Sequence, residues 1–431
     1  MSLIVAKFGG TSLATPERVK DVAARLVEYH NQKHRVVAVV SAMGKSTDDL
    51  LKLALSINKR PPSRELDRLL ATGEQASMAV LAMAIDALGV CSVSLSGRQA
   101  GIVTTSVFSK AQISEIHADR INEELDSGRI VVVAGFQGIT PKGDITTLGR
   151  GGSDTTAVAL AAGLKADICE IYSDVDGIYT ADPRQVPRAS KLKSITYEDM
   201  LELCASGSGV LQMRSVEVAR NFNVVLHCRS AFSSDEGTYV REDQKSGEGE
   251  SVEESIVTGI VADLSKVKVT LRGVPDRIGL AAELFTTIAE GGVMVDMIVQ
   301  NISEFGTTDI SFTVPESELP RLRPILDGAI EQLGAREYII KEEMVKLSVV
   351  GAGMQSSPGI AAQMFRVLAE AGVNIDMIAT SSIRISVVVG YDKVERVMQA
   401  LHTAYGLDSS EDFTDTHLSA EELAAKLSKG R

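Results

Sequence analysis

Two glycine-rich loops in the first half of the sequence each carry a cation. Residues 7–12 read KFGGTS, and residues 149–156 read GRGGSDTT. A glycine loop at the start of a helix leaves backbone N–H groups unpaired, with the positive end of the helix dipole behind them, and this arrangement suits a phosphate. The alternative is a tight turn that needs glycine only for a positive φ. Two such loops, each with its own cation, favour phosphoryl chemistry.

Two further segments place carboxylates next to predicted helices or strands. Asp174 and Asp176 lie in a glycine-containing turn, where they could hold a divalent metal or form an Asx turn. Glu74 lies near the start of an Ala/Met-rich stretch, where it could bind a cation or only favour the helix dipole. None of these segments contains histidine. A carboxylate acceptor needs no general base, because it is already ionised at pH 7, so Lys, Arg, N–H groups and Mg²⁺ would suffice.

Two better-known phosphate motifs are absent from the sequence. Gly44-Lys45-Ser46 resembles the end of a P-loop, but the required upstream glycine is Val39. Residues 149–154 and 351–356 each lack the third glycine of the dinucleotide-binding fingerprint. The sequence therefore supports neither a P-loop NTPase nor a Rossmann oxidoreductase.

The elements that must position these loops alternate between apolar strands and Ala/Leu-rich helices. Thr15 and Pro16 predict the start of the first helix as N-cap and first helical residue. Continuous apolar runs are typical of strands buried on both faces of a parallel sheet. The pattern predicts an α/β, helix–sheet–helix sandwich with a mainly parallel sheet. The predicted strands are residues 3–8, 35–40, 90–95, 130–136, 168–173 and 224–229.

The second half of the sequence contains an internal repeat. Residues 235–254 hold eight acidic and two basic residues, which indicates a solvated linker before it. Residues 279–298 then recur as residues 359–378 with 11 of 20 positions identical, at an offset of 80. Each copy reads as strand, helix, strand, strand, helix with a closing strand, which predicts tandem ferredoxin-like βαββαβ units.

Composition narrows the class of protein. The 431 residues suggest about three domains. The net charge of −13 argues against nucleic acid and anionic membranes as partners. We found no signal peptide and no apolar stretch near the ~18 residues that span a bilayer. Four separated cysteines without a CxxC pair predict reduced, mostly buried thiols and no zinc site. We expect a soluble, cytoplasmic protein.

Taken in order, these motifs resemble the aspartate kinases of the amino-acid-kinase fold. The segments that carry the resemblance are residues 7–12, 40–44, 71–75, 149–154 and 173–184. The 80-residue repeat resembles the tandem ACT domains of that family. The resemblance implies a three-layer αβα catalytic domain over residues 1–245, ACT domains over 262–341 and 342–417, and a polar tail over 418–431.

The implied reaction is ATP-dependent phosphorylation of the L-aspartate side chain to 4-phospho-L-aspartate, with ATP and Mg²⁺ as cofactors. This is the first step toward lysine, threonine and methionine. The residues implied to be catalytic are Lys7, Arg150 and Asp154. Those implied to bind ATP are Lys7, Phe8, Gly9, Gly10, Ser41, Ser173, Asp174, Tyr179 and Arg184. Those implied to bind aspartate are Thr47, Glu74, Arg150, Gly151, Gly152 and Ser153; no residue is assigned to a protein-held metal.

The resemblance also implies feedback control and a homo-oligomer formed through the ACT domains. Threonine, with lysine as a second candidate, would bind Asp276, Gly279, Ala281 and Gln300, with Asn374 and Ile375 from the partner side. The chain departs from the family at residues 212–214, 357–358 and 380–384, where Ser382 replaces a common Glu. These departures leave the effector open.

Two other functions stay possible at this point. One is a kinase of the same fold acting on glutamate, acetylglutamate or a nucleotide, against which residues 72–75 and the ACT pair argue. The other is a non-catalytic amino-acid sensor. The retention of Lys7, Arg150 and Asp154 in intact motifs argues against a sensor.

Overall fold

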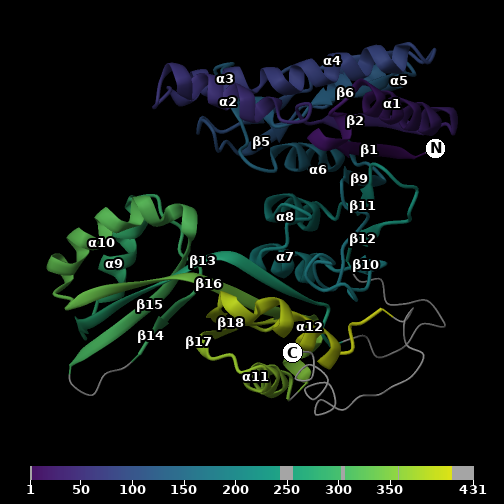
Figure 1. Ribbon diagram of the computed structural model, residues 1–431. Helices are drawn as coiled ribbons and strands as arrows, with labels where there is room; N and C mark the ends of the chain where they lie inside the picture. The colour runs from purple at the N-terminus through teal and green to yellow at the C-terminus, as the bar shows by residue number, and fades with distance from the viewer. Residues whose placement is uncertain (1, 243–255, 302–305, 358, 410–431) are drawn as a thin grey trace. The chain divides into compact units, whose positions relative to one another are not determined.

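The computed structural model describes residues 2–242, 256–301, 306–357 and 359–409. The chain divides into two compact units (Figure 1). The first contains residues 1–178, 191–204 and 209–250, and the second contains residues 179–190, 205–208 and 251–431. The two repeats therefore share one unit. The predicted limits of the catalytic and ACT domains remain predictions.

The first unit is built on an eight-stranded, mainly parallel sheet, as predicted. The strand order is β10-β12-β11-β9-β1-β2-β6-β3, and the antiparallel pair is β11 with β12. The strands are β1 (Leu3–Phe8), β2 (Arg35–Val40), β3 (Ser92–Leu95), β6 (Ile130–Ala134), β9 (Ile168–Ser173), β10 (Ser194–Ile195), β11 (Leu226–Ser230) and β12 (Thr238–Val240). A second sheet joins β5 (Ile113–Ile116), β4 (Ile102–Thr104), β7 (Gln137–Ile139) and β8 (Ile145–Thr147).

Helices cover both faces of the large sheet, which makes three layers. On one face, alternate residues of β1, β2 and β6 pack with apolar residues of α1 and α4. On the other face, α6 contacts β1, β2 and β9, because successive side chains of a strand point to opposite faces. The helices of this region are α1 (Pro16–Asn31), α2 (Ser46–Ile57), α3 (Ser63–Leu70), α4 (Thr72–Asp86), α5 (Asp119–Asp126), α6 (Gly152–Leu164), α7 (Tyr197–Ser206) and α8 (Met213–Phe222).

Most predicted elements of this unit are confirmed. β1, β2 and β9 have the predicted bounds, and the Thr15 hydroxyl accepts a hydrogen bond from the Arg18 N–H at the start of α1. The predicted linker is wrong at its beginning, where β12 lies between β10 and β11. Thr238, Tyr239 and Val240 favour a strand despite the acidic residues around them. Residues 243–254 of that linker, and the predicted tail, lie outside the described residues.

The second unit is built on one six-stranded sheet, in the order β14-β15-β13-β16-β18-β17. Two long strands, β13 and β16, pair antiparallel at its centre and run through both repeats. The ferredoxin-like units thus share strands instead of standing apart. The elements are β13 (Gly259–Pro275), α9 (Leu280–Glu290), β14 (Ile298–Gln300), β15 (Thr307–Pro315), α10 (Leu319–Leu333), β16 (Glu337–Val350), α11 (Ile360–Glu370), β17 (Ile375–Thr380), β18 (Arg384–Gly390) and α12 (Val394–Ala404).

A short segment from the catalytic half of the sequence completes the core of the second unit. Within residues 179–190, Ala181, Val186 and Ala189 pack among apolar residues of β16, β18, α11 and α12. The Thr180 hydroxyl lies 2.8 Å from Nε2 of the fully buried His402, whose Nδ1 lies 2.7 Å from Asp408 Oδ1. The segment is therefore held by both apolar packing and polar contacts.

The cysteines and the helices confirm part of what the composition predicts. All four cysteines are free; Cys169 and Cys228 are buried, whereas Cys91 is exposed. The expectation of mostly buried thiols is thus wrong for Cys91, which lies just before β3. No helix within the described ranges has the length and apolar character needed to cross a bilayer.

Candidate active site

Lys7 and Asp154 meet at the carboxyl end of the large sheet. Lys7 is the second-last residue of β1 and points to the face that α6 covers, and Asp154 lies in the first turn of α6. Lys7 Nζ lies 2.6 Å from Asp154 Oδ1, and the two side chains are 11% and 13% exposed. The cation of the first glycine loop is therefore held by the helix that follows the second loop.

The glycines of the first loop are needed because another segment of backbone approaches closely, and not because of a positive φ. Gly9 has an extended backbone with φ −69°. A Cβ on Gly10 would lie 2.7 Å from the carbonyl oxygen of Ala42, which follows β2. A side chain at residue 10 would thus push the two loops apart.

Glu74 joins the same strand ends from α4. Its side chain is buried, and its Oε1 accepts a hydrogen bond from the Ala42 N–H at 3.1 Å. Its Oε2 is buried and has no hydrogen-bond partner among the described residues. Burial raises the pKa of Glu74 to about 7, although the hydrogen bonds to backbone N–H groups oppose this. A carboxylate held in this way would gain from a cationic ligand.

The second glycine loop does use the left-handed region. Gly149 and Gly151 have φ of +78° and +69°, and Gly151 is the N-cap of α6. Arg150 between them is exposed, and no described residue pairs with its guanidinium. Ser153 is buried in the first turn of α6. This loop therefore presents a cation and a helix N-terminus at the strand ends.

Three residues missed by the sequence reasoning belong to this site. A Cβ on Gly135 would lie 2.9 Å from Ser153 Oγ and 3.0 Å from the Val40 carbonyl, so glycine is needed there. Phe136 adopts φ +67°, and Ser12 has a buried Oγ without a partner in the described structure. The Gly-Phe pair directly after the buried strand β6 was the available signal.

The remaining predicted residues of the first unit lie around the same strand ends with different exposure. The Phe8 ring is fully buried and stacks on Tyr172 at 4.8 Å, so only its backbone could meet a nucleotide. Ser41 and Thr47 are half-buried after β2 and in the first turn of α2. Ser173 ends β9, and the Asp174 side chain beyond it is exposed.

Tyr179 and Arg184 belong to the second unit. Tyr179 packs against the core formed by β16, β18, α11 and α12. Arg184 is 89% exposed and pairs with Asp182 at 2.7 Å. Asp176, the second carboxylate of the possible metal turn, forms an ion pair with Lys191 in the first unit. No group of three or more metal-ligating side chains occurs among the residues that the structure describes.

The predicted effector residues lie in two kinds of place: Asp276, Gly279 and Ala281 follow the central strand β13, and the others lie on the two edge strands. Gly279, with φ +91°, precedes α9 and lies near Asp276 and Ala281 in sequence. Gln300 ends β14, which is one edge strand, whereas Asn374 and Ile375 are at the start of β17, the opposite edge strand. Within one chain, Gln300 and the Asn374–Ile375 pair thus belong to opposite edge strands.

Comparisons with known proteins agree with the fold and the site. An amino acid kinase family model matches residues 2–230, and an ACT domain model matches residues 268–321 and 347–405. Together they define an amino acid kinase with C-terminal ACT domains. The aspartokinases of Corynebacterium efficiens and Mycolicibacterium smegmatis are each 48% identical to the chain, covering 96% of it and 98% of the relative. The chain belongs to the aspartokinase family: it is an aspartate kinase with regulatory ACT domains.

Solved structures show the same architecture. The aspartate kinase from Synechocystis is 43% identical, with a TM-score of 0.53, and the match covers 94% of this chain and 70% of that one. E. coli aspartokinase III, solved in complex with aspartate and ADP, has a TM-score of 0.78 at 23% identity over 94% of this chain and 99% of that one. At this identity, the similarity to E. coli aspartokinase III shows a shared fold.

Proposed function

We propose that the chain transfers the γ-phosphoryl group of ATP to the side-chain carboxylate of L-aspartate, giving 4-phospho-L-aspartate. The observation that carries this proposal is the convergence of Lys7, Asp154 and Glu74 at the ends of adjacent parallel strands. Open α/β sheets bind ligands at their carboxyl edge. An ionised acceptor needs no base, and the site contains no histidine.

The cations and the glycine loops would share the work of charge stabilisation. Lys7, with the backbone at Gly9 and Gly10, would bind the transferred phosphoryl group, and Asp154 would orient the Lys7 ammonium. Ser41, Ser173 and Asp174 would line the nucleotide site, with the Phe8 backbone. Tyr179 and Arg184 are further proposed nucleotide-binding residues.

Arg150 and Glu74 would hold aspartate at its two ends. The exposed Arg150 guanidinium suits a bidentate bond to a carboxylate. The buried, partly protonated Glu74 would become fully ionised when the substrate ammonium binds beside it. Thr47, Ser153 and the backbone at Gly151 and Gly152 would fix the position of the reacting carboxylate.

Mg²⁺ would be held mainly by the phosphates of ATP, as is usual for this ion. The Asp154 carboxylate, whose Oδ1 lies 2.6 Å from Lys7 Nζ, would add a negative charge beside the ion. When bound, the ion would neutralise charge on the phosphates. The Lys7 ammonium would then face the transferred group from the side of β1.

Regulation would require two chains. Gln300 and the Asn374–Ile375 pair lie at opposite edges of the sheet, so an effector that contacts both would bridge two copies. Ile298 on β14 and Ile378 on β17 are 51% and 45% exposed, and they offer apolar surface on both edges. We propose a homo-oligomer paired through these edges, with threonine and lysine as candidate effectors. The free thiols suit a cytoplasmic location.

An assay of ADP release tests the proposed function. Aspartate, glutamate, N-acetylglutamate and UMP would each be supplied with ATP and Mg²⁺. Of the four acceptors, we expect only aspartate to give rapid release of ADP. The product should be an acyl phosphate that hydroxylamine traps. Release with another acceptor, or with none of the four, would contradict the proposal.

Light scattering with and without threonine tests the proposed homo-oligomer, because a strictly monomeric chain would contradict it.

A further inference from the structure

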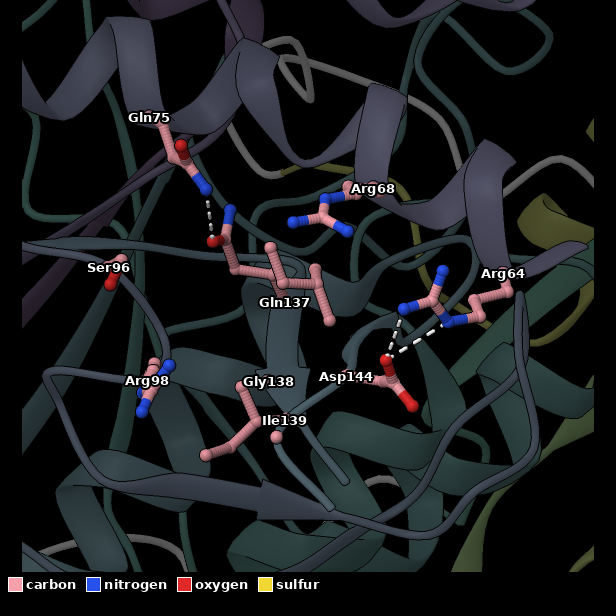
Figure 2. Close-up of a pocket in the computed structure, with 11 residues that line it drawn as sticks. Arg64, Arg68, Gln75, Ser96, Arg98, Gln137, Gly138, Ile139 and Asp144 are labelled. Carbon is pink, nitrogen blue, oxygen red and sulfur yellow. Dashed lines mark hydrogen bonds and ion pairs between the residues drawn. The ribbon is translucent and has the colours of Figure 1, made fainter. Parts of the chain in front are cut away.

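An arginine-lined cavity lies in the first unit and shares no residue with the predicted nucleotide and aspartate sites. Its volume is about 250 Å³, and its lining includes Arg64, Arg68, Arg98, Gln75 and Gln137. Figure 2 shows these side chains around one opening, with Arg64 and Arg68 coming from the same helix, α3. Side chains four residues apart lie on one face of a helix. The cavity therefore brings three cations together.

Two of the three guanidinium groups lack a counter-charge. Arg64 donates from Nε and Nη2 to Asp144 Oδ1, at 3.0 and 2.6 Å (Figure 2). Arg68 and Arg98 form no side-chain hydrogen bond or ion pair with any residue that the structure describes. Asp144 is the one carboxylate in the lining, so the wall carries a formal charge of +2. This occurs in a chain whose net charge is −13.

The wall of the cavity is held in place by buried contacts. Asp67, on α3, is fully buried and accepts four hydrogen bonds from Ser109 and Thr147, which fixes the helix that carries Arg64 and Arg68. Gln137 donates to the Ala71 carbonyl at 2.9 Å and accepts from the Gln75 amide at 3.1 Å. A site fixed before binding loses less entropy when its ligand binds.

The cavity is also separate from the phosphate loops. Arg98 follows β3, an edge strand, which lies three positions from β1 in the sheet. At the usual spacing of neighbouring strands, that distance is about 14 Å. Two strands, β2 and β6, therefore lie between the strand of Lys7 and the strand that Arg98 follows. Gln75 directly follows Glu74 in α4.

We propose that Arg68 and Arg98 bind a compact dianion in this cavity. A guanidinium group is planar and pairs with a carboxylate or a phosphate through two parallel hydrogen bonds. The volume is below the ~300–1,000 Å³ of sites that take drug-sized molecules. A nucleotide would not fit, whereas inorganic phosphate or a short dicarboxylate would. The shared chemistry is two negative charges on closely spaced oxygens, balancing the two unpaired cations.

Isothermal titration with two probes tests this site. Inorganic phosphate and succinate would each be titrated into the wild-type chain and into the Arg68→Gln/Arg98→Gln variant. The matched control is Arg220→Gln/Arg366→Gln, which removes the same charge from exposed residues on α8 and α11 that lie outside the cavity. Thermal unfolding of all three chains checks that each is folded. We expect the control to bind like wild type and the cavity variant to bind about tenfold more weakly, or worse.

The two probes separate the sources of the dianion. Binding of phosphate without succinate would identify a phosphate site, and binding of succinate without phosphate would identify a dicarboxylate site. Either outcome supports the proposal if the cavity variant no longer binds that probe. Equal affinity in the cavity variant and wild type would place the bound anion elsewhere. That result, or the absence of binding of both probes to wild type, would overturn the proposal.

Discussion

Two buried lysine–aspartate pairs, one in each unit, have the same length and different surroundings. Lys7 Nζ lies 2.6 Å from Asp154 Oδ1 in the first unit, and Lys346 Nζ lies 2.6 Å from Asp296 Oδ2 in the second. The Lys7 pair lies beside glycine loops and at the start of a helix. Lys346 is 1% exposed and also donates to the Ala205 carbonyl at 3.0 Å. The Lys7 and Asp154 side chains are 11% and 13% exposed, whereas in the second pair the lysine is enclosed by protein and Asp296 is 26% exposed.

We proposed a catalytic role for the first pair, and the second pair stabilises the fold of its unit. Asp154 lies in the first turn of α6, where the helix dipole favours a negative charge even without Lys7. Lys346 has no such support. Burial lowers the pKa of Lys346, and the hydrogen bond and charge of Asp296 offset this only in part. Removal of Asp296 should therefore lower the free energy of unfolding strongly, whereas removal of Lys7 should lower it much less.

The largest expected effect on stability follows from Asp296→Ala. The change leaves the Lys346 ammonium buried without a counter-charge, and we expect a loss of about 3–5 kcal/mol in the free energy of unfolding. Denaturant unfolding at pH 7 measures it. Lys346→Met, which removes the charge and keeps the volume, should stay within about 1 kcal/mol of wild type or exceed it. Equal losses in both variants would show that packing, and not the unpaired charge, is responsible.

Asp376→Ala is the matched control, because Asp376 occupies the position of Asp296 in the second repeat. It pairs with Lys268 at 3.2 Å and with Lys341 at 2.9 Å, and Lys341 is 56% exposed. Water can solvate the Lys341 ammonium when the carboxylate is removed, and Lys268, which is 15% exposed, keeps the Asp376 carbonyl oxygen at 3.3 Å. We expect a loss of about 1 kcal/mol or less. A loss as large as that of Asp296→Ala would remove the distinction between the two repeats.

The largest expected effect on activity follows from Lys7→Ala. We expect kcat to fall about 10²–10³-fold, because one charge-stabilising donor is lost at the transferred group. The free energy of unfolding should change much less than in Asp296→Ala, since Asp154 keeps the helix dipole. Steady-state kinetics and denaturant unfolding on the same preparation measure both. A variant with near-normal kcat would refute the role of Lys7.

Glu74→Gln should change the pH dependence of stability. The folded pKa of about 7 lies above the ordinary value of 4.5, so the folded state binds more protons than the unfolded state between these values. Stability therefore falls as pH rises through that window, and then levels off. Relative to Glu74→Gln, wild type should lose on the order of 2 kcal/mol between pH 5 and pH 8.

Aspartate gives this measurement a second arm. The substrate ammonium would restore the ionised form of Glu74, so saturating aspartate should raise the melting temperature of wild type at pH 8 and have little effect on Glu74→Gln. Parallel pH profiles for the two chains would argue against a buried, uncompensated carboxylate at residue 74.

The sequence predicted local elements well and long-range arrangements less well. Continuous apolar runs specified β1, β2 and β9 to the residue, because such strands are buried on both faces. The polar residues between 262 and 266 interrupt the apolar pattern, so the full length of β13 could not be predicted. Its pairing with β16 stabilises the strand across this interruption. Nothing local indicates that residues 179–190 pack in the second unit, since their partners, which include Ile260 and His402, lie far along the chain.

The site shows the same division. Lys7, Asp154 and Glu74 came from motifs at strand and helix ends, and the structure brings them to one edge. Gly135 and Ser12 were missed, because their importance lies in what approaches them: Ser153 and Val40 in one case, and buried surroundings in the other. Close approach is a property of the fold and leaves no trace in composition.

The smallest expected effect is inhibition by lysine alone, and it depends on which carboxylates the repeats leave unpaired. The lysine ε-ammonium needs an anionic partner, because burying it unpaired costs several kcal/mol. Asp296 is already paired with Lys346 and Lys266, and Asp376 is already paired with Lys268 and Lys341. At residue 382, where the related kinases often carry Glu, this chain has an exposed Ser.

We therefore expect lysine alone to inhibit weakly, and less than threonine. Allosteric coupling is about 1–3 kcal/mol in general, so the loss of one charge pair can cancel it. Dose–response curves for each amino acid, alone and together, measure this. Ser382→Glu should lower the half-inhibitory concentration of lysine by up to about tenfold, and leave that of threonine unchanged, because it adds one carboxylate. Ser382→Gln, which adds the same bulk without the charge, should behave like wild type. Strong inhibition of the wild-type enzyme by lysine alone would mean that Asp296 or Asp376 exchanges its internal lysine for the effector.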